Sequence, residues 1–421
     1  MHKQNINHLV MIVAGVALLV AGVSLFLQPG LWSVHFPVWI KKAVSEKLIL
    51  DVLVIGAIAL AIWFLAYKAG KKRAALIALL VVAALLRVPH FTEVGKDETA
   101  YISAVVDFLD GKNPYLRTID SFENVDDTGG HGYAYFPGFL YINIFFFSIQ
   151  LLTGMPLQIL QKIPTLLADL GIGILLIKEL RKKNYTALIC ALLFWYLNPY
   201  FLYKRNYVYF DPIPIFIMML SLYYLKKDDV ISGAFYGLAI LFKTFPVILL
   251  PIFLMKSKKW YRFLAAGSIV GLVSSIPFLN DVKSYLTGAV LVHSNRVVQG
   301  RPFLFFISYF YKVELFQIIP LRVYSTLATF AGWVAAPIVG IAKFAESKYA
   351  LSIIPFALFY LFTPVLNRTY LMWSMPVVAL GLFEQFHGKN KALYYIGLAA
   401  FWFFYYWYIS IWKDGFHIWK P

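Results

Sequence analysis

The sequence has little charge and almost no cysteine. Only 14% of the 421 residues are charged, whereas 61% belong to the set AVILMFWYC, and a water-soluble fold does not need so apolar a chain. Cys190 is the single cysteine and stands in an apolar run, so an intrachain disulfide and a cysteine-based metal site are excluded. The composition indicates an integral membrane protein. It excludes a secreted disulfide scaffold, a Rossmann enzyme and a nucleic-acid-binding domain as descriptions of the whole chain.

Motifs of several common chemistries are also missing. No GxGxxG or GxSxG pattern occurs, and no GxxxxGK precedes Ser or Thr, so nothing indicates nucleotide binding or acyl transfer. The histidines form no HxxxH or HExxH pattern, which argues against a histidine metal site. No small-residue cleavage site follows the apolar stretch 8–27, so we expect a retained first span rather than a signal peptide.

Apolar stretches recur along the whole chain, and about 20 such residues suffice to cross a bilayer. They lie at 8–27, 48–67, 74–90, 137–153, 158–177, 186–202, 212–225, 230–255, 262–279, 318–342, 349–366, 370–386 and 392–412. Short loops between them hold 18 of the 38 basic residues, at 68–73, 178–183, 226–227, 256–262, 343–348 and 389–391. Cytoplasmic loops carry an excess of Lys and Arg, so we expect these six loops to share the cytoplasmic side. The net charge of +17 is therefore interpreted as a sign of which loops face the cytoplasm.

The parity of crossings decides two ambiguous stretches. Loops 68–73 and 178–183 share a side only if the chain between them crosses an even number of times, so the aromatic-rich stretch 137–153 is predicted to be interfacial or re-entrant, with a true span as the alternative. Basic residues flank 230–255 at both ends, and Pro246 follows Lys243 in its middle. Proline breaks helices, so we predict a helical hairpin there. The result is an all-α polytopic membrane protein of about 13 transmembrane helices, with its N-terminus inside and its C-terminus outside.

Two long loops are predicted on the extracytoplasmic side, about 88–157 and 280–317, with shorter ones near 28–47, 203–211 and 366–370. The first long loop is expected to carry interfacial helices. It holds nine of the 21 carboxylates between Val88 and Pro137, and in a chain so poor in acid we expect the function there. No internal repeat is evident, so one multi-span domain is the simplest division.

The first motif of interest is Lys96-Asp97-Glu98-Thr99-Ala100-Tyr101, which follows a predicted span. It opens a helical pattern that ends near Gly111 and Pro114. A carboxylate at this helix start would face the membrane surface. The alternative is that Asp97 and Glu98 are first-turn residues favoured by the helix dipole.

Two further motifs place charge at or within the membrane. The segment 197–212 carries Lys204, Arg205 and Asp211 in a predicted outer turn, and its alternative role is an interfacial anchor of aromatics and snorkelling cations. Lys243 lies between apolar half-helices. Such a lysine is costly unless it reaches an anion or a water-filled cavity, and the alternative is that it snorkels to the outer surface.

Other polar residues carry weaker signals. Asp169 also lies in a predicted span, where a helix-packing role is expected. His131 and His293 fall in the predicted outer loops.

Several short segments, taken in their order along the chain, resemble those of the polytopic glycosyltransferases of the GT-C superfamily. The resemblance is to the polyprenol-phosphate-mannose-dependent mannosyltransferases of the glycosyltransferase 87 type, and it runs from about Leu76 to Trp373. No matching piece is a strict signature by itself, and their shared order carries the resemblance. The pieces are Asp97-Glu98 with Tyr101, Gly111-Lys112-Asn113-Pro114-Tyr115, Tyr135-Phe136-Pro137, Leu197-Asn198-Pro199 with Phe210-Asp211, Phe242-Lys243-Thr244-Phe245-Pro246, and Asn367-Arg368-Thr369-Tyr370-Leu371-Met372-Trp373.

The resemblance implies transfer of a sugar, with mannose expected, from a polyprenyl-phosphate donor to a glycan, lipid or protein acceptor at the extracytoplasmic face, with inversion. Asp97 occupies the position of the family's catalytic base. The departing phosphate needs positive charge nearby, and the side chains that could supply it without a metal are Lys243, Arg205, Arg296, Arg301 and Arg368. The other predicted substrate-binding residues are Glu98, Tyr101, Tyr135, Asp211, His293 and Tyr370, with Asp211 as a secondary site carboxylate and Glu98 as a structural neighbour.

On this resemblance, residues 1–73 add two N-terminal transmembrane helices to a catalytic domain over 74–421. The sequence departs from relatives at Pro137, where they often have two prolines, and at 210–212, which is not the DxD of metal-dependent relatives. The residues indicate no cofactor, and a divalent metal is left open. The expected partners are the lipid-linked donor, the acceptor and the bilayer, with no nucleic acid, and the expected location is the cell membrane.

Two other functions fit part of the pattern. A polymerase or ligase for lipid-linked glycans would also transfer glycosyl groups, but it joins preassembled chains. A secondary transporter would have a similar number of spans, with repeated halves and ionisable groups near the bilayer midplane. Here the acids gather in one outer loop and no repeat is visible, which favours the transferase.

Overall fold

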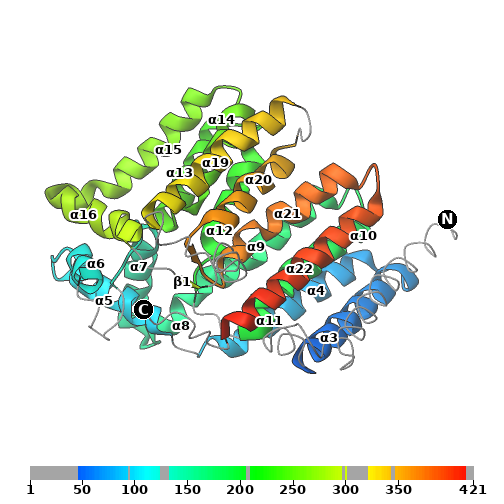
Figure 1. Ribbon diagram of the computed structural model, residues 1–421. Helices are drawn as coiled ribbons and strands as arrows, with labels where there is room; N and C mark the ends of the chain where they lie inside the picture. Colours follow the sequence, from blue (N-terminus) through cyan, green and yellow to red (C-terminus); the bar gives the residue numbers. More distant parts are fainter. Residues whose placement is uncertain are drawn as a thin grey trace, which may run out of the picture. The chain divides into compact units, whose positions relative to one another are not determined.

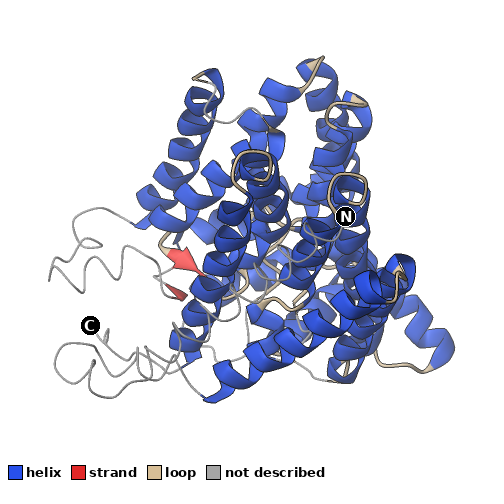
Figure 2. Ribbon diagram, turned by 90° about the vertical axis from the view of Figure 1, so that its right-hand side faces the viewer, coloured by secondary structure: helices blue, strands red, loops and turns tan. Residues whose placement is uncertain are grey.

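The computed structural model describes residues 46–92, 95–123, 132–204, 209–295, 299–300, 321–342 and 347–413. Within these residues the protein is helical, apart from one short parallel pairing of β1 (Gln299–Gly300) with β2 (Val365–Leu366). Figure 2 shows this pair as the only strands among the described helices. The all-α expectation is confirmed, whereas the predicted first span at 8–27 lies outside the described residues.

Several helices have the length and composition of membrane spans. Among the described residues, four helices are long and apolar enough to cross a bilayer: Leu50–Lys68, Leu157–Leu180, Trp260–His293 and Lys391–Ile409. Shorter apolar helices accompany them at Gly138–Thr153, Tyr185–Tyr196, Pro212–Tyr224, Asp229–Phe242, Phe245–Lys256, Thr329–Ile341 and Lys348–Phe362. The chain is therefore an integral membrane protein. The count of about 13 crossings and the non-crossing role of 137–153 stay predictions.

The chain divides into two compact units. The described part of the first contains α3 (Glu46–Trp63), the π-helix η1 (Phe64–Lys68), α4 (Lys72–Arg87), α10 (Tyr185–Tyr196), α11 (Pro199–Lys204), α21 (Tyr370–Phe386) and α22 (Lys391–Lys413). Long aromatic side chains of α22 connect these helices: Tyr394 donates to the Ala187 carbonyl, and Trp402 donates to the Leu197 carbonyl, at 3.1 and 2.8 Å. The predicted domain boundary at residue 73 stays a prediction.

The second unit spans Arg87–Leu175 and Asn206–Asn367. Its described elements are η2 (Val88–His90), α5 (Lys96–Leu109), α6 (Pro114–Glu123), α7 (Gly138–Thr153), α8 (Leu157–Leu160), most of α9 (Lys162–Leu180), α12 (Pro212–Tyr224), α13 (Asp229–Phe242), η3 (Phe245–Leu249), α14 (Leu250–Lys256), α15 (Trp260–Ser275), η4 (Ile276–Asp281), α16 (Val282–Ala289), η5 (Leu291–Asn295), α19 (Leu321–Ile341) and α20 (Lys348–Phe362). Figure 1 shows α13 beside α15 and α19 beside α20.

The hairpin predicted for 230–255 is present. Helix α13 stops at Lys243, whose backbone is extended at φ −151° and ψ 144°, and Pro246 stands at the start of η3. The two ends of the hairpin meet, because the Asp229 carboxylate accepts backbone hydrogen bonds from Lys258 and Lys259 at 3.2 and 2.7 Å. Proline cannot continue a helix without losing a hydrogen bond, and this places the break where the sequence predicted it.

Glycines allow α13 and α15 to cross at backbone contact. A Cβ atom at Gly233 would lie 2.1 Å from the Phe263 carbonyl oxygen, and one at Gly237 would lie 2.4 Å from the Gly267 carbonyl oxygen. Small residues spaced four apart are the usual means of close helix packing in membranes, since they let the two backbones approach. This crossing fixes α13, whose C-terminal end carries Lys243.

Replacing Gly237 by valine is expected to lower the free energy of unfolding by about 1–3 kcal/mol, because the added methyl groups would overlap the α15 backbone. Gly271 provides the matched control, since it lies on α15 and a Cβ there meets nothing within 4 Å. Thermal unfolding in detergent should separate Gly237→Val from Gly271→Val. Equal destabilisation by both would assign the effect to helix propensity rather than to the crossing.

Candidate active site

The carboxylates Asp97 and Glu98 stand in the first turn of α5. Gly95 precedes this turn with an extended backbone, and its N–H donates to Glu98 Oε2 at 2.7 Å. This returning glutamate satisfies one of the N–H groups that have no partner at a helix start. Glu98 is completely buried, whereas Asp97 is half-buried. The side chains of Asp97 and Glu98 therefore have different surroundings, although the two residues are adjacent in sequence.

Glu98 is fixed from a second helix. Lys162, at the start of α9, brings its Nζ within 3.3 Å of Glu98 Oε1 and donates to the Phe91 carbonyl at 2.8 Å. Lys162 is itself only 2% exposed. Burial raises the pKa of the Glu98 carboxyl, against the opposing effects of the Gly95 N–H and the Lys162 ammonium. Because the carboxylate is held on both oxygens, it positions the first turn of α5.

The raised pKa of Glu98 gives a prediction about stability. Since the folded state holds the Glu98 proton more tightly than the unfolded state, stability should fall as pH rises from about the ordinary carboxyl value of 4.5. Glu98→Gln removes this dependence, so the melting temperature of the wild type should decline relative to the variant with rising pH. A wild type that instead gains stability over the variant would show that the pair with Lys162 outweighs burial.

Four aromatic rings from separate elements meet beside α5. Tyr101 of α5 contacts the rings of Tyr135, Phe139 and Phe210, with centroids 6.4, 5.1 and 5.6 Å away. Phe139 stacks on Phe210 at 4.0 Å, and Tyr135 meets Phe210 edge-on at 5.1 Å. We call these four residues the aromatic cluster. Such contacts bury apolar area and restrict ring orientation.

A buried ion pair adjoins the aromatic cluster. Lys243 Nζ lies 2.8 Å from Asp211 Oδ1, where α13 ends and α12 begins. The ammonium also lies 5.0 Å from the Phe210 ring centroid and 5.5 Å from that of Tyr135, within cation–π range. Asp211 is 0% and Lys243 is 8% exposed. An ammonium buried in this way does not snorkel to a surface, which removes the alternative raised from the sequence.

The buried Tyr101 hydroxyl forms no hydrogen bond with the described residues and lies within electrostatic range of both candidate carboxylates. Burial raises the pKa of Tyr101 well above its ordinary value, and the electrostatic effect of the neighbouring Tyr135, Asp97 and Asp211 side chains adds to the rise. Asp97 and Asp211 therefore act electrostatically on the same phenol. Residues from the α5 start, the 133–139 segment, the α12 start and the α13 end thus form one cluster.

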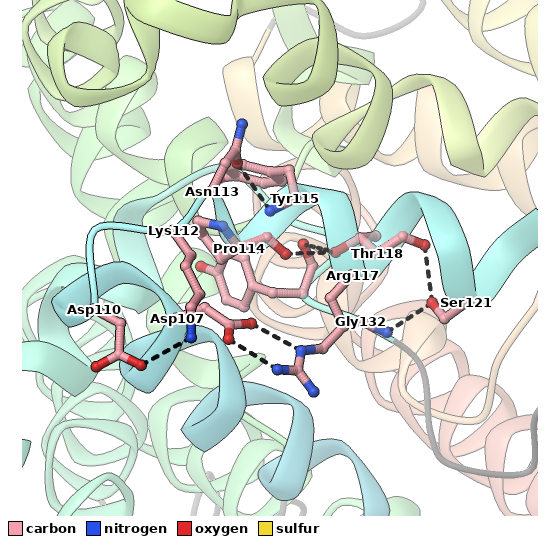
Figure 3. A network of polar contacts seen from close by, with 11 residues as sticks. Asp107, Asp110, Lys112, Asn113, Pro114, Tyr115, Arg117, Thr118, Ser121 and Gly132 are labelled. Atoms are coloured by element: carbon pink, nitrogen blue, oxygen red, sulfur yellow. Dashed lines mark hydrogen bonds and ion pairs between the residues drawn. The ribbon is translucent and has the colours of Figure 1, made fainter.

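The segment that carries Tyr135 is held by a polar network around α6, drawn in Figure 3. Tyr115 donates its hydroxyl to the Tyr135 carbonyl at 2.9 Å, and Thr118 donates to the Tyr133 carbonyl at 3.0 Å. Arg117 binds both oxygens of Asp107 at 2.8 Å. Asp107, which is 7% exposed, is thereby committed to this framework.

His293 also reaches the cluster. Its Nε2 lies 2.7 Å from the Ala134 carbonyl, so the ring donates there, and its centroid is 6.5 Å from that of Tyr135. The histidine contacts the chain on the residue before Tyr135. His293 therefore ties η5 to the segment that carries Tyr135.

Comparison with known families agrees with this arrangement. Residues 133–364 match the description "Glycosyltransferase family 87", which is more than half of the chain. The chain belongs to glycosyltransferase family 87. Tyr135, Asp211, Lys243 and His293 lie inside the matched range, whereas Asp97 precedes it.

A curated relative gives a second, shorter likeness. The family 87 chain is 35% identical to GPI mannosyltransferase 1 of Kluyveromyces lactis over 89 residues, which make up 21% of this chain and 22% of that protein. The likeness thus spans about a fifth of each protein. No solved structure matches the chain.

The remaining predicted site residues of this family 87 chain belong to the first compact unit or lie outside the described residues. Arg368 and Tyr370 belong to the first compact unit, where the Arg368 carbonyl accepts from Tyr405 at 2.7 Å and Tyr370 stacks on Trp373 at 3.9 Å. Arg205, Arg296 and Arg301 lie outside the described residues, as does His131. Among the described residues there is no group of three His, Cys, Asp or Glu side chains that could hold a metal ion.

Two buried cations in the family 87 chain were not anticipated. Lys162 pairs with Glu98, and Arg87 pairs with Asp169. Asp169 was expected to have a helix-packing role, and Arg87 is its buried partner. Each cation lies inside a stretch predicted to be apolar, 158–177 or 74–90. A cation within an apolar stretch needs an anionic partner, and that requirement is the signal that could have found both.

Proposed function

We propose that this protein transfers a sugar, with mannose as the first candidate, from a polyprenyl-phosphate donor to a hydroxyl of a glycan, lipid or protein acceptor at the extracytoplasmic membrane face. Membership of family 87 and the mannosyltransferase relative support sugar transfer. The apolar helices around the cluster support a donor that is delivered through the bilayer. The catalytic unit on this proposal is the GT-C-like domain over 74–421.

The observation that carries the proposal is the buried Lys243–Asp211 pair beside Tyr101 and Tyr135. A phosphate leaving an anomeric carbon gains negative charge, and a fixed ammonium in a site that excludes water stabilises that charge strongly. Asp211 holds the ammonium in place before the donor arrives. When the phosphate binds, the Lys243 ammonium has two anionic neighbours.

Asp97 supplies the complementary half of the reaction. Its carboxylate accepts the proton of the acceptor hydroxyl as that oxygen forms a bond to the anomeric carbon, while the bond from this carbon to the phosphate oxygen breaks with its electron pair. Attack opposite to the leaving phosphate inverts the configuration. Glu98, held by Gly95 and Lys162, keeps the first turn of α5 in position.

The test is a transfer assay with the full chain reconstituted in vesicles. A radiolabelled polyprenyl-phosphate mannose should give label in an acceptor fraction, whereas a labelled nucleotide sugar should not, and the anomeric configuration of the product should be inverted. Addition of single sugars would distinguish this function from that of a polymerase or ligase, whose products lengthen by preassembled chains. A chelator added in a parallel sample tests the divalent metal. Transfer from the nucleotide sugar alone would overturn the proposal.

A further inference from the structure

Five exposed residues begin α15 and precede it: Lys258, Lys259, Trp260, Tyr261 and Arg262. Trp260 is 56% and Tyr261 is 53% exposed. Aromatic rings and cations side by side are typical of a segment at the headgroup level of a bilayer, since the ring is amphipathic and the cation binds phosphate. This segment takes no part in the site described above.

Two more cations join the segment from another turn. Lys226 and Lys227 are exposed and follow α12. The Asp229 carboxylate, three residues beyond Lys226, accepts the backbone N–H groups of Lys258 and Lys259, so the two turns lie together. We call Lys226, Lys227, Lys258, Lys259 and Arg262 the α15 basic surface.

The acidic residues in these turns do not neutralise this surface. Asp228 Oδ1 accepts the N–H groups of Val230 and Ile231, and both Asp229 oxygens accept backbone N–H groups. Within the described part of the chain, no cation of the α15 basic surface forms an ion pair. By contrast Lys183, in another basic loop, lies within 4 Å of both Glu179 and Glu384. The surface thus holds charge without a protein counterion.

The outward face of α15 continues from these cations as an apolar surface. Ile269, Leu272 and Val273 are 59%, 68% and 59% exposed. Only 17% of the most apolar part of Trp260–His293 is buried in the protein, against 61% for Leu157–Leu180. Helix α15 therefore presents cations at one end and open apolar side chains along its length.

We propose that the α15 basic surface is a binding site for an anionic phospholipid. The lipid phosphate contacts Lys258, Lys259 and Arg262, and its acyl chains lie along the exposed face of α15. Charge complementarity selects an anionic headgroup, because a zwitterionic one brings its own cation to a surface that already has five. The proposal needs only binding and does not depend on sugar transfer.

The experiment uses the full chain in detergent, titrated with fluorescent phosphatidylglycerol and, separately, with fluorescent phosphatidylcholine. The triple variant Lys258→Gln/Lys259→Gln/Arg262→Gln should weaken phosphatidylglycerol binding by about 100-fold, since each basic residue near an anionic surface contributes about fivefold. Phosphatidylcholine binding should be unchanged. An unchanged melting temperature checks that the variant is folded.

The matched control removes three exposed cations from the first unit, as Lys68→Gln/Lys71→Gln/Arg73→Gln. It lowers the net charge by the same amount but leaves the α15 basic surface intact, so phosphatidylglycerol binding should stay within about twofold of the wild type. Equal losses in both triple variants would overturn the proposal, and so would full retention in the α15 variant. A second copy of the chain is the alternative occupant of the exposed α15 face. If the protein is a dimer that Leu272→Arg dissociates, and this variant still binds phosphatidylglycerol, the proposal is also overturned.

Discussion

Asp97→Asn is expected to lower the rate of sugar transfer by about 10²–10⁴-fold, because removing a general base has an effect of that size. The substitution is nearly isosteric and the side chain is half-buried, so expression and donor binding should be retained. The measurement is single-turnover transfer from a polyprenyl-phosphate sugar at saturating donor. Loss of a helix-dipole contact alone would cost about 0.3–1 kcal/mol of stability and would leave the rate almost unchanged.

Asp97 is favoured over two nearby carboxylates, Glu98 and Asp107, because both of these have structural partners. Asp107 is held by two of the three guanidinium nitrogens of Arg117, and Glu98 by Gly95 and Lys162. Asp110, exposed at the end of the same helix, offers a control. Asp110→Asn should leave transfer unchanged. If Asp97→Asn keeps more than about a tenth of the activity, the base lies elsewhere, with Glu98, Asp107 and Asp211 as the next residues to replace.

Lys243→Met is expected to destabilise the protein by about 3–5 kcal/mol, because it leaves Asp211 buried without its counterion. The double variant Lys243→Met/Asp211→Asn removes both charges and should recover most of that stability. Donor binding should not recover. Loss of a charge-assisted hydrogen bond to phosphate costs about 1.5–3 kcal/mol, or roughly 10–100-fold in affinity.

Stability and donor affinity are therefore measured separately in the same variants. The exposed pair Lys112–Asp110 gives the matched control, since its side chains are 67% and 51% exposed and 3.1 Å apart. Lys112→Met/Asp110→Asn should change stability by less than about 1 kcal/mol and leave donor affinity unchanged. A folded Lys243→Met/Asp211→Asn protein with wild-type donor affinity would assign the buried pair a structural role only.

Local signals in the sequence correctly predicted several features. The break at Lys243 follows from Pro246, and the α5 start follows from two acids placed before a helical pattern. Both depend on residues within one turn of each other, where backbone chemistry dominates. The all-α fold follows from the hydropathy of the whole chain.

The partners across the fold could not be predicted in the same way. Lys243 and Asp211 are 32 residues apart, and Lys162 and Glu98 belong to different helices. Hydropathy shows that a charge is buried but not which opposite charge it meets, because that depends on which helix faces pack together. The parallel pairing of β1 with β2 was missed for the same reason: two-residue strands have no periodic signal.

The short length of α12 and α13 has a consequence for the depth of Lys243. They contain 13 and 14 residues, or about 20 Å of helix at 1.5 Å per residue, against a hydrocarbon thickness of about 30 Å. On the predicted topology, in which α13 begins at the cytoplasmic surface, its end at Lys243 therefore lies about 10 Å short of the outer edge of the hydrocarbon core. On the proposed function, the donor phosphate would bind Lys243 below the headgroup plane rather than at it.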